Sequence, residues 1–293
     1  MVTTGRGVSL EVLDWGGSGR PLVFLAGGGA STPHVFDEFA PRFTDDFRVL
    51  GITRRGNGAS SDVRPRRFAD LVGDIVAVIN ALQLQSVVLV GHSFAGLEIA
   101  HFAEKHADRC FGLIYLDSAY DYNDPELHRI FEAHQPPSAP PMLAADSASI
   151  DAVRAWSERT QGFRMPKSAI RATRRFDSNG RMIGAVTPGS AKWRIESPSP
   201  RWEAVTCPSL GIYAVPAPPE SWLLYWNELD SHQRAAADAY FTAFAPWAKA
   251  QRSAFGKHAH NQVIEFPSSN HYFFLERADE AERVMREFLE KRH

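Results

Sequence analysis

The stretch that decides the fold runs from residue 87 to residue 96 and reads Val87-Val88-Leu89-Val90-Gly91-His92-Ser93-Phe94-Ala95-Gly96. Its first four residues are all apolar, which is typical of a central parallel strand buried on both faces. A tight turn around Ser93 follows, and the next residues have the spacing of a helix. A nucleophile elbow, which presents a serine on a sharp turn, requires this order of strand, turn and helix, with small residues such as Gly91 and Ala95 two positions away. The stretch therefore predicts a nucleophile at Ser93.

Short apolar runs alternate with helical stretches on both sides of this turn. The predicted strands are Val8–Trp15, Leu22–Leu25, Arg48–Ile52, Val87–Val90, Leu113–Leu116, Leu210–Ala214 and Val263–Phe266. The predicted helices are Phe68–Leu82, Phe94–His106 and Arg277–Lys291. This alternation predicts an α/β fold, a mostly parallel sheet with flanking helices.

The alternation breaks over residues 121–205, which contain proline-rich segments and short helical candidates. Strands resume at Leu210, so we expect a mainly helical insertion into a sheet domain formed by residues 1–120 and 206–293. Residues 151–205 hold 11 Lys and Arg against 5 Asp and Glu. This excess of positive charge has two interpretations: a solvated basic face, or a cationic lid that attracts an anionic substrate.

Composition excludes several other classes of protein. The chain has 293 residues, a formal net charge of -2 and two cysteines. Near-neutral charge gives no general attraction to nucleic acid or to an acidic membrane. Two cysteines build neither a secreted disulfide scaffold nor a four-cysteine metal site. No apolar run has the length of a signal peptide or membrane span, so we expect a soluble, cytoplasmic protein.

Three further motifs follow the order of a known family. They are Leu22–Ala30, with three successive glycines, Gly51–Ser60, which contains Arg-Gly-Asn-Gly-Ala-Ser, and Asn270–Glu276. Because of these motifs and the serine turn, the chain resembles the α/β-hydrolase family. The insertion lies where that family places its cap. The resemblance implies an oxyanion hole made by the backbone amides of Gly28 and Phe94. It also implies that Cys110 and Cys207 precede adjacent strands, where we expect two reduced thiols.

A serine nucleophile needs a base and an acid. His271 follows the last predicted strand and is the predicted base. The family's usual acid position, after Leu210–Ala214, has no carboxylate before Glu220. Asp117 directly follows the strand Leu113–Leu116 and is the predicted acid, with Asp121 and Glu220 as the alternatives. We expect His92 to serve in packing.

The order serine, aspartate, histidine predicts a hydrolase of a small or medium, largely apolar carboxylic ester or lactone. Carbon–carbon bond hydrolysis, hydroxynitrile cleavage and a weakly catalytic ligand receptor stay open. We expect no cofactor, no metal, and no nucleic-acid or membrane partner; the sequence does not predict the oligomeric state. The predicted substrate-binding residues are His34, Phe36, Tyr120, Trp156 and Tyr272, with Trp222, Tyr225 and Trp226 as a second aromatic group.

Overall fold

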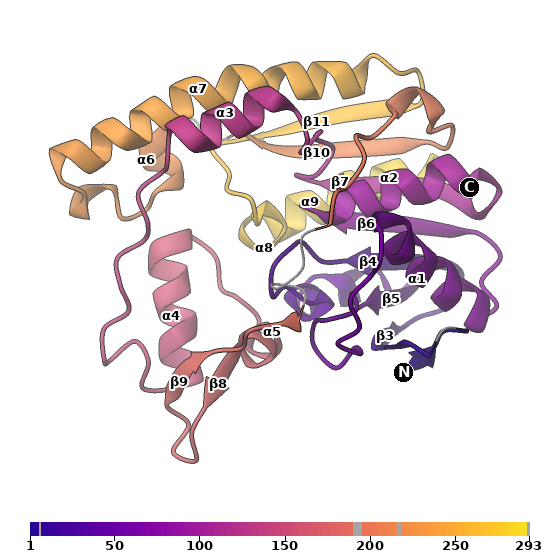
Figure 1. Ribbon diagram of the computed structural model, residues 1–293, viewed down its shortest axis with the longest axis horizontal. Coiled ribbons are helices and arrows are strands. Elements are labelled where there is room, and N and C mark those ends of the chain that lie inside the picture. Colours follow the sequence, from indigo (N-terminus) through magenta and orange to yellow (C-terminus); the bar gives the residue numbers. More distant parts are fainter. Residues whose placement is uncertain (6, 190–194, 216–217, 292–293) are drawn as a thin grey trace.

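A seven-stranded sheet forms the centre of the molecule (Figure 1). The computed structural model describes residues 1–5, 7–189, 195–215 and 218–291. In sheet order, the strands are β11 (Asn261–Pro267), β10 (Ser209–Val215), β7 (Cys110–Leu116), β6 (Val87–His92), β4 (Arg20–Leu25), β5 (Phe47–Ile52) and β3 (Val12–Gly16). Only β3 pairs antiparallel with its neighbour, and the other described pairs are parallel. The predicted mostly parallel sheet is confirmed.

The predicted first strand, Val8–Trp15, is divided in two. Its first part, β2 (Ser9–Leu10), pairs antiparallel with β1 (Val2–Thr3) outside the main sheet, and its second part is β3. Between them, the carbonyl of Glu11 accepts a hydrogen bond from the amide of Thr53 at 3.0 Å. This bond to the loop after β5 takes Glu11 out of either strand ladder.

Helices cover both faces of the sheet. One face packs against α1 (Phe68–Ala81), α2 (Ala95–Lys105) and α7 (Ser231–Gly256). The other packs against the short helices η1 (Pro33–Phe36), η2 (Ala40–Phe43) and α8 (Phe273–Glu276), and against α9 (Ala278–Glu290). Elsewhere lie the single turns η3 (Ala107–Arg109), η5 (Trp202–Ala204) and η6 (Trp226–Glu228) and the short helix α6 (Pro219–Trp222).

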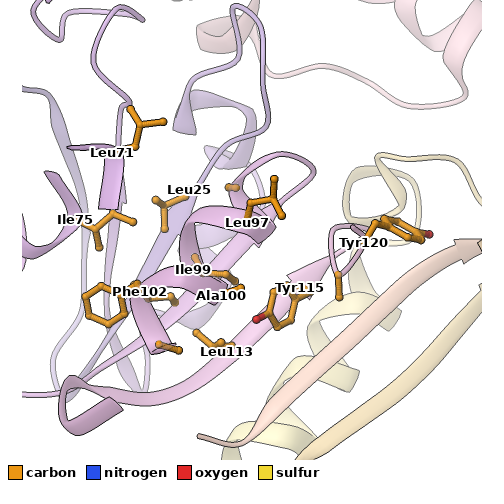
Figure 2. Close-up of a cluster of buried hydrophobic side chains, with 14 of the residues drawn as sticks. Leu25, Leu71, Ile75, Leu97, Ile99, Ala100, Phe102, Leu113, Tyr115 and Tyr120 are labelled. Carbon is orange, nitrogen blue, oxygen red and sulfur yellow. The ribbon is translucent and has the colours of Figure 1, made fainter. Parts of the chain in front are cut away.

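Successive strand residues contribute to two different hydrophobic clusters. Val87 and Leu89 of β6 belong to the first cluster, whereas Val88 and Val90 belong to the second. Part of the first cluster, with strand and α2 side chains together, is shown in Figure 2. Because strand side chains alternate between faces, an all-apolar run such as residues 87–90 of β6 is stable only between two such layers.

The segment between β7 and β10 contains α3 (Pro125–Ala133), α4 (Ile150–Gln161), α5 (Lys167–Thr173) and a small antiparallel pair, β8 (Arg174–Phe176) with β9 (Met182–Ala185). Figure 1 shows α4, α5, β8 and β9 grouped beside the sheet, with α3 against α7. The small strand pair was not predicted. Its turn closes through a hydrogen bond from the Asp177 amide to the Arg181 carbonyl at 2.9 Å, with Gly180 at a φ of 78°.

The long helix α7 lies between β10 and β11 and was also not delimited from the sequence. It contains Pro246, which ordinarily predicts a break in a helix. The rings of Phe131 in α3 and Tyr240 in α7 stack with centroids 6.3 Å apart. Within the described residues, no helix has the length and apolarity needed to cross a membrane.

Candidate active site

The turn between β6 and α2 holds Ser93 in a left-handed conformation, with φ at 54°. Such a φ is rare for a residue with a side chain, so the surrounding packing must impose it. A Cβ on Gly91 would lie 2.9 Å from the Ala95 carbonyl oxygen, and one on Gly96 would lie 2.1 Å from that of Ser118. The glycines therefore let the helix start against its neighbours, while Ala95 itself fits.

The predicted acid, Asp117, lies at the carboxyl end of β7, next to the end of β10. Its amide donates to the Ile212 carbonyl at 2.7 Å, and its φ of 45° is left-handed as well. Its Oδ2 is 2.6 Å from Nδ1 of His271. Its Oδ1 accepts from the Tyr120 hydroxyl at 2.8 Å and from the Ala214 amide at 3.2 Å. The buried carboxylate is thus fixed by donors from three chain segments.

The alternative acids lie in other surroundings. The Asp121 carboxylate accepts from the Asn123 amide at 2.9 Å, within a local turn, and its own amide donates to Gln251 of α7 at 3.0 Å. Glu220 lies in the first turn of α6. Of the three candidates, the structure brings Asp117 to His271.

The loop after β11 carries His271. Its start is fixed by a hydrogen bond from the Ser268 amide to the Val215 carbonyl at 2.9 Å, and its middle by one from the Asn270 side chain to the Gln161 carbonyl of α4 at 2.8 Å. Because Nδ1 faces Asp117, that nitrogen carries the proton and Nε2 is the basic one.

His92 supports this loop from inside the protein. Its Nε2 donates to the His271 carbonyl at 3.0 Å, and the two imidazole rings lie 4.4 Å apart. Complete burial lowers the pKa of His92 well below its usual value, and the nearby His271 adds to this effect. His92 is therefore neutral and packs beneath the loop.

The glycine loop after β4 lies directly against the serine turn. A Cβ on Gly27 would be 3.0 Å from Cβ of Ser93, and one on Gly28 would be 3.5 Å from Cβ of Phe94. Phe94 caps the start of α2, where backbone N–H groups lack partners within the helix. The two amides predicted to form the oxyanion hole are thus brought to the same place as Ser93.

Arg54, to which the sequence assigned no role, holds the carbonyl side of this loop. Its guanidinium donates to the carbonyls of Ala26 and Gly27 at 3.0 and 2.7 Å, and to both carboxylate oxygens of Glu98 at 2.8 and 2.6 Å. The Gly27 carbonyl and the Gly28 amide belong to one trans peptide group and point in opposite directions. Fixing that carbonyl therefore fixes the direction of the Gly28 N–H.

A cavity of about 280 Å³ opens beside Ser93. It is lined by Ser93, Asp117, Tyr120, Tyr122, Leu127, Phe131, Ala214, Trp222, Tyr240, Phe241, Phe244, Trp247 and His271. Burial raises the pKa of Tyr122 far above its usual value, with the Asp117 charge adding to it, and the hydroxyl hydrogen-bonds to Ser93. We call this space the serine cavity.

A second cavity of about 510 Å³ shares Trp222 and His271 with the serine cavity. Its remaining lining residues are Pro136, Pro137, Ser138, Ala139, Thr160, Gln161, Phe163, Leu223, Tyr225, Asn270 and Tyr272. Ser93 is not among them. We call this second space the histidine cavity. Trp222 forms part of the wall of both cavities.

The predicted substrate-binding residues are distributed unevenly. Tyr120 lines the serine cavity and Tyr272 the histidine cavity, whereas His34, Phe36 and Trp156 line neither. Phe36 is fully buried, with ring centroids 5.0 Å from Phe24 and 5.1 Å from Phe274 in the core.

His34 lies outside both cavities, and its ring pairs with the side chain of Asp37 at 2.8 Å. From the second aromatic group, Trp222 lines both cavities and Tyr225 the histidine cavity. The Trp226 carbonyl accepts a hydrogen bond from Arg234 instead.

Sequence reasoning did not find the aromatic wall from α7, formed by Tyr240, Phe241, Phe244 and Trp247. The signal was present, because these positions have the spacing of one helical face. The described lining of both cavities carries no Lys or Arg from residues 151–205, so the cationic side chains described in this stretch lie outside both cavities. There, Arg154 pairs with Glu38 and Lys167 with Asp151.

Comparison with known proteins places these features in a family. The family described as "Alpha/beta hydrolase family" matches residues 22–284. A non-heme haloperoxidase from Rhodococcus erythropolis is 35% identical over 106 residues, 36% of this chain and 38% of the relative. A bifunctional esterase/perhydrolase from Acinetobacter calcoaceticus is 34% identical over 107 residues, 36% of this chain and 39% of the relative. The chain thus matches well under half the length of these relatives.

Solved structures resemble the chain over nearly its whole length. The E-2-(acetamidomethylene)succinate hydrolase has a TM-score of 0.66 at 20% identity, covering 99% of this chain and 97% of that one. An esterase from Thermogutta terrifontis has a TM-score of 0.61 at 20% identity, covering 100% and 98%. At this identity, the likeness shows a shared fold.

Proposed function

The chain belongs to the α/β-hydrolase family, and from that premise we propose that it is a serine hydrolase of a carboxylic ester or lactone. The observation that carries the proposal is that one cavity is lined both by Ser93, in its left-handed turn, and by His271, whose Nδ1 lies 2.6 Å from Asp117. Ester hydrolysis is also the activity named for the Acinetobacter calcoaceticus relative.

Each residue has a role set by its chemistry. Ser93 attacks the ester carbonyl carbon while Nε2 of His271 takes the hydroxyl proton. The Asp117 carboxylate stabilises the imidazolium that forms and keeps its Nδ1–H oriented. The same proton then passes to the leaving alcohol, and an acyl-enzyme on Ser93 remains. Water, activated by His271, releases the acid.

Negative charge develops on the carbonyl oxygen during attack, and backbone donors must already point at it. We assign these donors to Gly28 and Phe94. Arg54 acts as a positioning residue, because it holds the Gly27 carbonyl at 2.7 Å and so directs the Gly28 amide. The buried Glu98, 2.8 Å from the guanidinium, keeps Arg54 in place.

Residues 121–205 act as a cap in this proposal. They supply Tyr122, Leu127 and Phe131 to the serine cavity, and residues 136–139, Thr160, Gln161 and Phe163 to the histidine cavity. The aromatic residues of α6 and α7 complete the cover from outside that segment. Covering the site excludes water until the acyl-enzyme has formed.

The test is labelling with a fluorophosphonate, together with turnover of short-chain 4-nitrophenyl esters. Wild-type protein is expected to label at Ser93 and to turn over many times, and Ser93→Ala to do neither. Ser118→Ala is the matched control, since Ser118 is a buried neighbour whose hydroxyl bonds the Gly91 carbonyl at 2.7 Å. Unlabelled folded protein, or an active Ser93→Ala, would refute the serine-hydrolase proposal.

The same measurements separate the remaining alternatives. Slow labelling without turnover would favour a ligand receptor, whereas carbon–carbon or hydroxynitrile cleavage requires direct assay with those substrates. One relative, from Mycobacterium tuberculosis, is named an epoxide hydrolase and is 33% identical over 98 residues, 32% of this chain and 28% of the relative. An aspartate nucleophile is the residue expected for that chemistry, and the nucleophile position here holds Ser93.

A further inference from the structure

The two cavities touch different members of the catalytic group. Ser93 lines the serine cavity alone, while His271 lines both. In ester hydrolysis the acyl carbon bonds to the serine oxygen, and the leaving alcohol oxygen takes its proton from the histidine. The acyl group must therefore extend from Ser93, and the alcohol group from the side of His271.

The walls of the serine cavity are unusually rich in aromatic rings. Of its described lining residues, eight are Phe, Tyr or Trp. Several are already paired with one another: Tyr120 stacks on Trp247 with centroids 5.4 Å apart at 25°, and Tyr240 on Phe244 at 5.4 Å and 12°. Flat walls of this kind favour a flat ring, because aromatic pairs gain attraction beyond the area they bury.

Charge and size restrict the acyl group further. The described lining residues include no Lys, Arg or Glu. Asp117 is the one Asp among them, and its carboxylate is hydrogen-bonded to His271. The Tyr120 hydroxyl is bonded to Asp117 and the Tyr122 hydroxyl to Ser93. A charged acyl group would find no partner. The volume, about 280 Å³, is at the small end of ligand sites and suits one or two rings.

We infer that the serine cavity binds an uncharged aromatic acyl group, and that the alcohol part of the ester occupies the histidine cavity beyond Trp222. This inference rests on the proposed function. The histidine cavity is larger, about 510 Å³, and carries polar side chains such as Thr160, Gln161 and Asn270. It accordingly accepts alcohols of wider size and polarity than the acids admitted beside Ser93.

The experiment compares phenylacetate with cyclohexylacetate esters of one leaving alcohol, 4-methylumbelliferone. The two acids differ in ring aromaticity and little in size or carbonyl reactivity. We expect kcat/KM to favour phenylacetate by about 3–10-fold after correction for alkaline hydrolysis rates. Phe241→Leu should reduce this ratio towards one, because Phe241 lines the serine cavity. Phe163→Leu, in the histidine cavity, should leave the acyl ratio unchanged.

A binding measurement keeps this result separate from the catalytic proposal. Trp222 and Trp247 line the serine cavity, so their fluorescence reports occupancy in Ser93→Ala. Phenylacetamide is expected to bind about 3–10-fold more tightly than cyclohexylacetamide. Equal binding, or a ratio favouring cyclohexyl esters, overturns the aromatic acyl site. Selective binding without Ser93-dependent hydrolysis of any ester overturns the proposed function and retains the aromatic site.

The two cysteines give a second observation, at the opposite edge of the sheet. Cys110 starts β7 and Cys207 precedes β10, and their sulfur atoms lie 2.7 Å apart in a buried position. Both thiols are free in the structure. A disulfide bond is about 2.05 Å long. A small change in side-chain torsion therefore suffices to join them.

We infer that Cys110 and Cys207 form a disulfide when a peroxide is the oxidant. One thiolate attacks the peroxide, forming a sulfenic acid and water; the second thiol attacks that sulfur and releases a second water. The two cysteines are 97 residues apart. The bond would close the whole segment between β7 and β10 at its base, including α3, α4 and α5.

The test oxidises the protein with hydrogen peroxide, both folded and during refolding, because the hydrogen bond with Cys207, together with burial, raises the pKa of the Cys110 thiol and slows its reaction. After denaturation, N-ethylmaleimide should label neither cysteine, and the intact mass should fall by two hydrogens. Tm should rise by about 5–10 °C and should return to its initial value when dithiothreitol reduces the bond. Cys207→Ser should show no such rise. Two labelled thiols after oxidative refolding would exclude the bond.

Discussion

The carboxyl edge of the sheet and the cover above it are built in different ways. At the edge, Ser93 and Asp117 both have left-handed backbones, and each is fixed by hydrogen bonds between adjacent strand ends. The cover, formed by α3, α6 and α7, is held mainly by aromatic contacts and by a few polar ties such as that at Asp124. Changes at the edge should therefore alter kcat, whereas changes in the cover should alter substrate selection.

After the loss of Ser93 itself, the largest effect is expected at the acid. Asp117→Asn should lower kcat by about 10³–10⁴-fold, since the amide stabilises neither the imidazolium nor the required tautomer. Asp121→Asn and Glu220→Gln are the matched controls and should stay within a few-fold of wild type. Steady-state kinetics on one ester measures all three. An inactive Glu220→Gln variant together with an active Asp117→Asn variant would assign the catalytic acid to Glu220 instead of Asp117.

The next effect concerns the support of the oxyanion hole. Arg54→Gln should lower kcat by about 10–100-fold with a smaller change in KM, because the Gly28 amide loses its fixed direction. Fluorophosphonate titration corrects for the folded fraction.

Arg55→Gln provides the control for Arg54. Arg55 is buried and likewise pairs with a carboxylate, that of Asp74, at 2.6 Å, and among the described residues it makes no hydrogen bond to the glycine loop. Its loss should reduce stability and leave kcat per active site within a few-fold. Equal losses of kcat in both variants would show that Arg54 serves only folding.

The cover has a corresponding test at Asp124. Its Oδ2 accepts from Trp247 Nε1 and from Gln251 Nε2, both at 2.9 Å, while its Oδ1 caps α3. Asp124→Asn keeps the cap and turns the shared acceptor into a donor, at a cost of about 1–3 kcal/mol. KM for esters with an aromatic acyl group, such as phenylacetate esters, should rise several-fold, while kcat for acetate esters changes little. A large fall in acetate kcat would break the division between edge and cover.

The smallest effect is expected at His34, which lines neither cavity. The hydrogen bond that the His34 ring donates to Asp37 raises the pKa of His34 against the opposing effect of burial, and the charges of Asp37 and Glu11 contribute. Stability from this pair is complete below the unfolded pKa of about 6.5, and is lost as pH rises through the higher folded value.

Consequently, His34→Gln should lower Tm by a few degrees at pH 5.5 and by less at pH 8.5, with kcat unchanged at either pH. Thermal denaturation across this range, paired with ester kinetics, measures both. A changed KM for esters would instead support the sequence prediction that His34 contacts substrate.

Much of the sheet edge was predictable because its signals are local. The apolar run of β6, the glycines around Ser93 and the carboxylate directly after β7 each record a backbone requirement at that position. The predicted pairing of residues follows from parallel topology, which brings strand ends to one edge. The oxyanion support was not predictable, because nothing near Arg54 in sequence indicates that it reaches the Ala26 and Gly27 carbonyls.

The α/β-hydrolase fold and the residues proposed for catalysis could be predicted from the sequence, since strand periodicity and tight turns are properties of a few consecutive residues. The tertiary structure alone decided which aromatic residues face Ser93. It placed Phe36 in the core and drew Phe241 and Trp247 of α7 into the cavity wall. An aromatic side chain gains similar free energy from burial in a core or in a binding site. Only the packing of distant helices distinguishes the two.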